Sequence, residues 1–135
     1  MRKLWLAAGL AAVFSTFAMA EDGEYLFDLL KRSAHKTAWN AMLASGGKIP
    51  DWVRIFGDGG NGVASPSGLI AVGGQTYQIA NVCKAHDCAG NEVHVLFSFG
   101  AAKAWGLLLE TGKPQRFLGG PNAAQQQALR EDLGK

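Results

Sequence analysis

Residues 76–99, TYQIANVCKAHDCAGNEVHVLFSF, hold the pattern that decides the fold of this chain. From position 92 onward an apolar side chain occurs at every second residue, which is typical of a β-strand with one face in a core. Val93, Val95, Phe97 and Phe99 fall on one face, and His94 and Ser98 fall on the other. Residues 76–82 indicate the preceding strand. The six residues from Cys83 to Cys88 lie between these strands, so the pattern predicts that they cap a hairpin.

Further strands are predicted on both sides of this hairpin. Residues 69–72 precede a Gly73-Gly74 pair that is typical of a tight turn, and residues 102–110 and 115–118 follow as two more strands. Residues 102–110 carry apolar side chains on both faces, which indicates a sheet that is covered on both sides. Because the connections between the strands are short, they favour an antiparallel meander over crossover units.

Helical patterns occupy the two ends of the predicted domain. Residues 24–43 carry two apolar stripes whose phase slips across residues 33–37, which predicts two short helices. Residues 48–56 are expected to be extended or irregular, and a last helix is expected to open at residues 120–122. The predicted fold class is therefore α+β, an antiparallel meander of about five strands with helices covering both faces.

The start of the chain carries the three parts of an export signal. Two basic residues are followed by an uncharged apolar run at residues 4–17, and Ala18-Met19-Ala20 then provides small side chains at a cleavage site. An uncleaved membrane anchor would need about 20 apolar residues, and this run is shorter. We therefore expect residues 1–20 to be removed and residues 21–135 to act in the periplasm as a single domain.

The charge balance and the cysteines narrow the function further. The whole sequence has 13 basic and 11 acidic residues, but two of the basic ones, Arg2 and Lys3, fall in the expected signal. The remaining domain has 11 of each, which excludes the basic surface used for non-specific binding of nucleic acid or anionic membranes. Cys83 and Cys88 form an even count in an oxidising compartment, which predicts one disulfide bond.

Other chemistries fit these residues less well. A thiol oxidoreductase needs two residues between its cysteines at the start of a helix, and here four residues separate them. A zinc site could use both cysteines with His86 and His94, but oxidation would remove the thiolates. Residues 57–62, GDGGNG, lack the Gly-Lys-Ser/Thr ending of a phosphate loop and are expected to form a flexible surface loop. No metal or cofactor is therefore expected.

The histidines outside the cysteine-bounded segment are expected to be structural. His35 lies on the predicted helical stretch, where a surface or interface position is expected. His94 lies on the less apolar strand face, where a packed or half-exposed ring is expected.

A disulfide between Cys83 and Cys88 would close a ring of six residues. Such a short ring contributes about 2 kcal/mol of stability by chain entropy, which is a weak reason for its presence. Local rigidity is a better reason, because the ring would hold Lys84, His86 and Asp87 away from the sheet with little freedom to lose on binding. A simple hairpin staple with solvated polar residues stays open as the alternative.

The segment Cys83-Lys84-Ala85-His86-Asp87-Cys88 resembles the signature of the inhibitor of vertebrate lysozyme (Ivy) family, which are exported proteins of Gram-negative bacteria. A Gly-x-x-Tyr pattern at residues 74–77 and the segment Ala104-Trp105-Gly106 extend the resemblance over the expected domain. The family's common form has proline where this chain has Ala85.

The resemblance implies an inhibitor of C-type lysozyme that is not itself an enzyme. In this family the loop enters the substrate cleft and its histidine meets the two catalytic carboxyl groups, so the implied lysozyme-binding residues are Lys84, Ala85, His86 and Asp87. A homodimer is compatible with this reading. Two other functions stay open: an enzyme acting on peptidoglycan, for which no pair of acidic residues stands out, and a periplasmic structural or binding protein with the loop as a staple.

Overall fold

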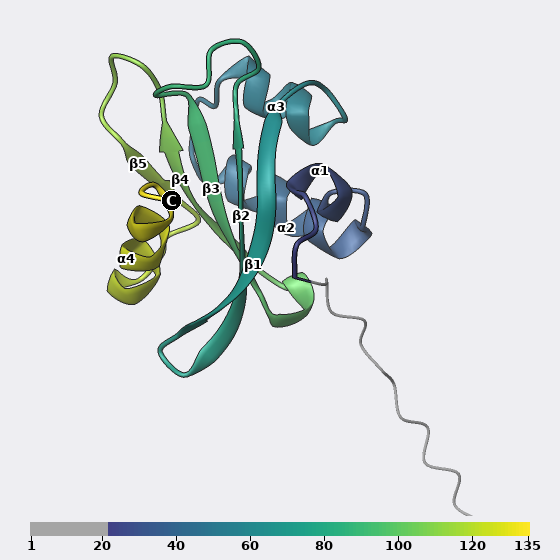
Figure 1. Cartoon of the computed structure of the whole chain (residues 1–135), viewed down its shortest axis with the longest axis vertical. Coiled ribbons are helices and arrows are strands. Elements are labelled where there is room, and N and C mark those ends of the chain that lie inside the picture. The colour runs from purple at the N-terminus through teal and green to yellow at the C-terminus, as the bar shows by residue number, and fades with distance from the viewer. Residues whose placement is uncertain (1–21) are drawn as a thin grey trace, which may run out of the picture.

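The structure, a computed structural model, describes residues 22–135, so the predicted signal peptide and its cleavage site lie outside the described residues. An antiparallel sheet in the order β1-β2-β3-β4-β5 forms its centre (Figure 1). The strands are β1 (Val63–Val72), β2 (Gln75–Cys83), β3 (Glu92–Ser98), β4 (Ala104–Leu109) and β5 (Arg116–Leu118). Each strand pairs with the one before it, which confirms the predicted five-stranded meander.

The first hairpin is longer than its sequence pattern indicated. Gly73 and Gly74 form its turn with φ values of 59° and 79°, which confirms the predicted tight turn. β1 starts at Val63, well before residue 69, and its pairing with β2 shifts register between Ser65 and Gly68. Because the register changes in that stretch, the regular alternation that marks a strand is lost there.

Helices precede and follow the sheet in the chain. They are α1 (Leu26–Leu29), α2 (Ser33–Ala44), α3 (Asp51–Gly57) and α4 (Ala123–Asp132), with a 3-10 turn, η1 (Phe99–Ala101), after β3. The two helices predicted within residues 24–43 are present, but the break between them falls at residues 30–32 and not at 33–37. The predicted C-terminal helix is confirmed, and Asn122 caps it together with Gln125 in a reciprocal capping box.

The prediction of an extended or irregular segment at residues 48–56 is wrong, because α3 occupies most of it. Pro50 stands directly before this helix, at a position where the helix needs no backbone N–H, so the missing N–H of proline costs no hydrogen bond. Val53 and Phe56 lie three residues apart and are both buried, so one side of this short helix faces the core. Pro50 therefore marks a helix start.

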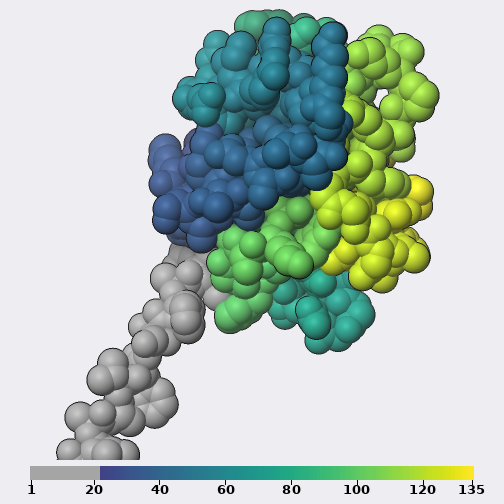
Figure 2. Space-filling view, turned by 180° about the vertical axis from the view of Figure 1, so that it is seen from behind, coloured from purple at the N-terminus to yellow at the C-terminus, as the bar shows by residue number. Residues whose placement is uncertain are grey.

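Helices cover both faces of the sheet, as predicted. On one face α1, α2 and α3 pack over the sheet, and Figure 2 shows this helical layer in blue from behind. The core between these helices and the sheet includes the buried side chains of Leu26, Trp39, Phe56, Val93, Val95 and Phe97. On the other face α4 packs through Leu129 against Leu96 and Leu107. Within residues 22–135, no helix has the length and apolar character needed to cross a membrane.

The predicted position of Phe99 is wrong. This residue was expected to share the buried face of Phe97, but β3 ends at Ser98 and Phe99 falls in η1 with 58% of its surface exposed. The alternation of apolar residues therefore continues in the sequence for one residue beyond the end of the strand.

Candidate functional site

The loop between β2 and β3 carries the residues predicted to bind a partner. β2 ends at Cys83 and β3 begins at Glu92, so the predicted hairpin cap is confirmed. Cys83 and Cys88 form the predicted disulfide, with their Cα atoms 4.8 Å apart. Cys83 is buried at the end of its strand and Cys88 is exposed. The closed ring of residues 83–88, called the disulfide ring below, is thus anchored in the sheet at one end and projects from it.

The backbone of the disulfide ring turns at His86. The N–H of Asp87 donates to the carbonyl of Lys84 over 3.2 Å. His86 has a φ of 64°, in the left-handed region, which costs a residue other than glycine about 1–2 kcal/mol. Histidine adopts this region more often than most residues. The side chain of His86 is exposed, so the turn presents the imidazole to solvent.

The charges of the disulfide ring balance one another. The ammonium nitrogen of Lys84 lies 3.6 Å from a carboxylate oxygen of Asp87, and both side chains are partly exposed. An ion pair this exposed contributes little to stability. The ion pair keeps the positive charge of Lys84 close to the negative charge of Asp87, so the two charges offset each other beside His86.

Asn91 braces the disulfide ring from outside, and sequence reasoning missed it. Its side-chain Nδ2 donates to the carbonyl of Asp87 over 3.1 Å and to Oγ1 of Thr111 over 3.0 Å. Its Oδ1 accepts from the backbone N–H of Thr111 over 3.3 Å. Asn91 is only 8% exposed, so these hydrogen bonds are largely shielded from water. The one signal in the sequence was an Ala-Gly-Asn run directly before a strand, which also fits an ordinary loop.

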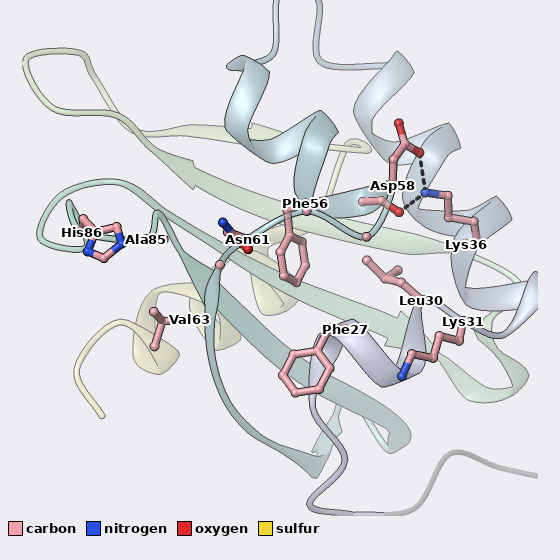
Figure 3. Close-up of a pocket in the computed structure, with 14 residues that line it drawn as sticks. Phe27, Leu30, Lys31, Lys36, Phe56, Asp58, Asn61, Val63, Ala85 and His86 are labelled. Atoms are coloured by element: carbon pink, nitrogen blue, oxygen red, sulfur yellow. Dashed lines mark hydrogen bonds and ion pairs between the residues drawn. The ribbon is translucent and has the colours of Figure 1, made fainter.

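A groove of about 1000 Å³ begins beside the disulfide ring (Figure 3). Ala85 and His86 line one end of it, and Phe27 of α1 lines it farther along. Phe27 and Val63 leave 44% and 58% of their surfaces exposed. Lys36 donates to the carbonyl of Gly57 and to a carboxylate oxygen of Asp58, the latter over 2.9 Å. Exposed apolar side chains beside a polar rim are typical of a surface that contacts a partner.

Residues 57–62 form one wall of this groove. Asp58, Gly59 and Asn61 are exposed, as predicted for a surface loop, but Gly57 ends α3 and is buried. A side chain at Gly62 would meet Phe56 at 2.6 Å and Val82 at 2.7 Å. Close packing of the connection against the core therefore explains this glycine.

The other two histidines are both part of the core. His35 was expected at the surface or at an interface, and it is not at the surface. Its ring is 6% exposed where α2 meets the sheet, packs edge-on against Phe97, and has Nε2 3.3 Å from Oε1 of Gln78. Burial lowers the pKa of His35 below its usual value of 6.5, although the hydrogen bond with Gln78 opposes this. His94 is packed, as expected, with Nδ1 2.6 Å from a carboxylate oxygen of Asp132 on α4.

The residues around the disulfide ring differ from those that a zinc site or a glycosidase uses. The two cysteines that a zinc site would need are bonded to each other. Within residues 22–135, no three His, Cys, Asp or Glu side chains are grouped to hold a metal ion. A glycosidase needs two carboxyl groups across its cleft, whereas the groove beside His86 is lined, within the described part of the chain, by the single carboxylate of Asp58.

The fold and this site define a small α+β protein that presents a disulfide-closed hairpin loop. Residues 34–134 match the family model described as inhibitor of vertebrate lysozyme (Ivy), and the chain belongs to this family. A Pseudomonas aeruginosa protein named inhibitor of vertebrate lysozyme is 38% identical over 106 residues, which cover 78% of this chain and 67% of that protein.

Two further relatives show how the similarity is distributed. The Escherichia coli protein named inhibitor of vertebrate lysozyme is 35% identical over 88 residues, which cover 65% of this chain and 52% of that protein. The aligned segment thus spans about half the length of that relative. A Pseudomonas aeruginosa protein named as uncharacterized is 31% identical over an alignment of 149 positions, which covers 98% of this chain and 94% of that protein.

Proposed function

We propose that this protein inhibits C-type lysozyme by inserting the disulfide ring, with His86 at its tip, into the active-site cleft of the enzyme. Membership of a family named for lysozyme inhibition supports the inhibitory function. The observation that carries the site is the exposed imidazole of His86 on a ring that is closed by a disulfide and held by Asn91. A rigid projection with one polar group at its tip fits a concave site and loses little entropy on binding.

The chemistry of an imidazole matches the catalytic centre of C-type lysozyme. That centre holds a glutamic acid kept protonated by an apolar pocket and an aspartate that stays ionised. A neutral imidazole has one donor and one acceptor nitrogen, so His86 donates to the aspartate and accepts from the glutamic acid. An imidazolium would instead be held by the negative charge of the aspartate, which would raise the pKa of His86 in the complex.

The neighbours of His86 have supporting roles in this proposal. Asp87 lies 3.6 Å from the ammonium group of Lys84, which offsets part of the repulsion between its carboxylate and the acidic centre of the enzyme. Lys84 reaches carbonyl groups at the rim of the cleft, and Ala85 adds apolar contact where the groove begins.

The proposed site of action is the periplasm, after removal of residues 1–20. N-terminal sequencing of secreted material should then begin at Glu21, and recovery of Met1 in a membrane fraction would contradict export as a cleaved protein. A homodimer stays a prediction, and sedimentation velocity of the purified domain checks it.

A cell-wall lysis assay tests the proposed function. Residues 21–135 are purified and titrated into a fixed amount of C-type lysozyme with a suspension of cell walls. An inhibitor lowers the rate of clearing in proportion to its concentration until the enzyme is saturated. Clearing by the protein alone would identify a peptidoglycan-acting enzyme, and a clearing rate that stays the same at every ratio would leave the ring as a structural staple.

A further inference from the structure

Asn91 makes contact with both sides of the turn that carries His86. Besides its side-chain hydrogen bond to the carbonyl of Asp87, its backbone carbonyl accepts from the N–H of Lys84 over 3.0 Å. Its own N–H donates to the carbonyl of Cys88 over 3.1 Å. The backbone on each side of His86 is therefore tied to one buried residue.

The same side chain ties the disulfide ring to a different part of the sheet. Thr111 follows β4 and lies in the turn that leads to β5, and its hydroxyl and N–H both bond to the amide of Asn91. Gly90 permits this approach, because its φ is 78° and a side chain there would lie 3.2 Å from the Thr111 hydroxyl. The disulfide closes the ring on itself, and Cys83 anchors one end of it in β2, but the disulfide does not link the ring to the turn between β4 and β5. The amide of Asn91 supplies that second constraint.

We propose that Asn91 is a positioning residue that holds the disulfide ring in its binding orientation by bridging it to Thr111. The proposal rests on the proposed function for its consequence in binding. If the ring samples several orientations, the affinity falls in proportion to the fraction of time spent in the competent one. Loss of the bridge should therefore lower the rate of association with lysozyme and leave dissociation of the formed complex nearly unchanged.

Asn91→Ala removes both arms of the bridge, and Thr111→Val removes the hydroxyl while keeping the size of the side chain and the backbone N–H. The matched control is Asn81→Ala. Asn81 is a half-buried residue of β2 whose side chain accepts from the N–H of Ser65 over 3.3 Å and lies 3.4 Å from a carboxylate oxygen of Asp132. Both asparagines have hydrogen-bonded amides, but the partners of the Asn81 amide, Ser65 and Asp132, lie outside the disulfide ring.

Association is measured by stopped flow at a temperature well below the midpoint of thermal unfolding. We expect Asn91→Ala to slow association about tenfold and Thr111→Val about threefold, with Asn81→Ala at the wild-type rate. Thr111→Val in the Asn91→Ala background should add little, because the shared bond is already gone. A general loss of stability would lower the midpoint of unfolding without producing this non-additive pattern.

Amide hydrogen exchange on the free protein gives a readout that does not depend on lysozyme. The N–H groups of Lys84 and Asp87 should exchange faster in Asn91→Ala than in the wild type, while core amides of β3 keep their protection. If the wild type fails to inhibit lysozyme, the proposed function falls and exchange still decides whether Asn91 orders the ring. The proposal would be overturned if Asn91→Ala associates with lysozyme at the wild-type rate and its Lys84 and Asp87 amides exchange at the wild-type rate. If Asn91→Ala does not fold, the same two results in Thr111→Val would overturn it.

Discussion

His86→Ala removes the side chain that the proposed mechanism places between the two catalytic carboxyl groups of lysozyme. The imidazole is exposed in the free protein but would lie at the centre of the interface, bonded to two groups of which at least one is charged. Truncation would leave those groups desolvated and unpaired, which at a central position of this kind typically costs about 2 kcal/mol or more. That free energy corresponds to a loss of affinity of roughly thirtyfold.

The backbone at this position requires a second variant. Because His86 has a φ of 64°, alanine there could change the turn as well as remove the ring. Asparagine adopts the left-handed region readily, so His86→Asn keeps the turn and changes the side chain alone. Both variants should lose inhibition to a similar extent, whereas Lys84→Ala, nearer the rim, should cost about 1 kcal/mol or less and act mainly on the association rate.

The assay is an inhibition titration against C-type lysozyme, with a thermal melt of each variant. The melt of His86→Asn should match that of the wild type, because the site is exposed and asparagine keeps the left-handed turn, whereas His86→Ala should lower the unfolding free energy by about 1 kcal/mol, since alanine adopts this region less readily. An inhibition constant that is the same for the wild type, His86→Ala and His86→Asn would refute the proposed role of His86, even if the protein inhibits lysozyme through another surface.

Three further outcomes are expected. Replacing Cys83 and Cys88 by alanine should weaken inhibition by roughly tenfold or more while lowering unfolding free energy by about 2 kcal/mol. Inhibition at the wild-type level in a folded variant would show that the disulfide is not needed to order the loop for binding. Burial lowers the pKa of His35 in the folded state, so the unfolded state takes up the proton first as the pH falls below 6.5, and the unfolding free energy should decrease there. Urea titrations at several pH values should show a smaller decrease in His35→Gln than in the wild type. An equal dependence of unfolding free energy on pH in the two proteins would argue against this role of His35. Val63→Ser should reduce affinity about fivefold if the partner covers the groove. The control is Leu69→Ser, which changes another exposed apolar residue of β1 outside the groove and should have no effect. Equal affinities of the two variants would show that the groove is not part of the interface.

Much of the fold could be predicted because the sheet is built from local patterns. β3 alternates in apolar character, β4 is apolar on both faces, and their connections are too short for crossover units, so the meander follows from residues near one another in sequence. α3 was missed because a helix of this length shows too few turns for its period to stand out, and Pro50 fits a helix start as well as an irregular segment.

The candidate site was predictable only in the part that is local. The disulfide and the exposed His86 belong to one short segment with a recognisable signature. The role of Asn91 depends on Thr111, which is brought beside it by the pairing of β3 with β4. Likewise, His35 is buried because α2 packs on the sheet near Phe97, and no pattern in the helix alone reports which neighbour it will meet.

The short span of the disulfide has a consequence for how the protein acquires its structure. The sequence contains two cysteines, and they lie five positions apart, so only one intramolecular pairing exists. Closing so short a loop needs little search, because segments of about ten residues make end contact within roughly 10–100 ns. Oxidation can therefore occur before the distant strands have paired, and no incorrectly paired monomer has to be reshuffled by an isomerase. Two faulty products remain: a chain whose cysteines stay reduced, and two chains joined by a disulfide bond. In both products the bond between Cys83 and Cys88 of the same chain is missing.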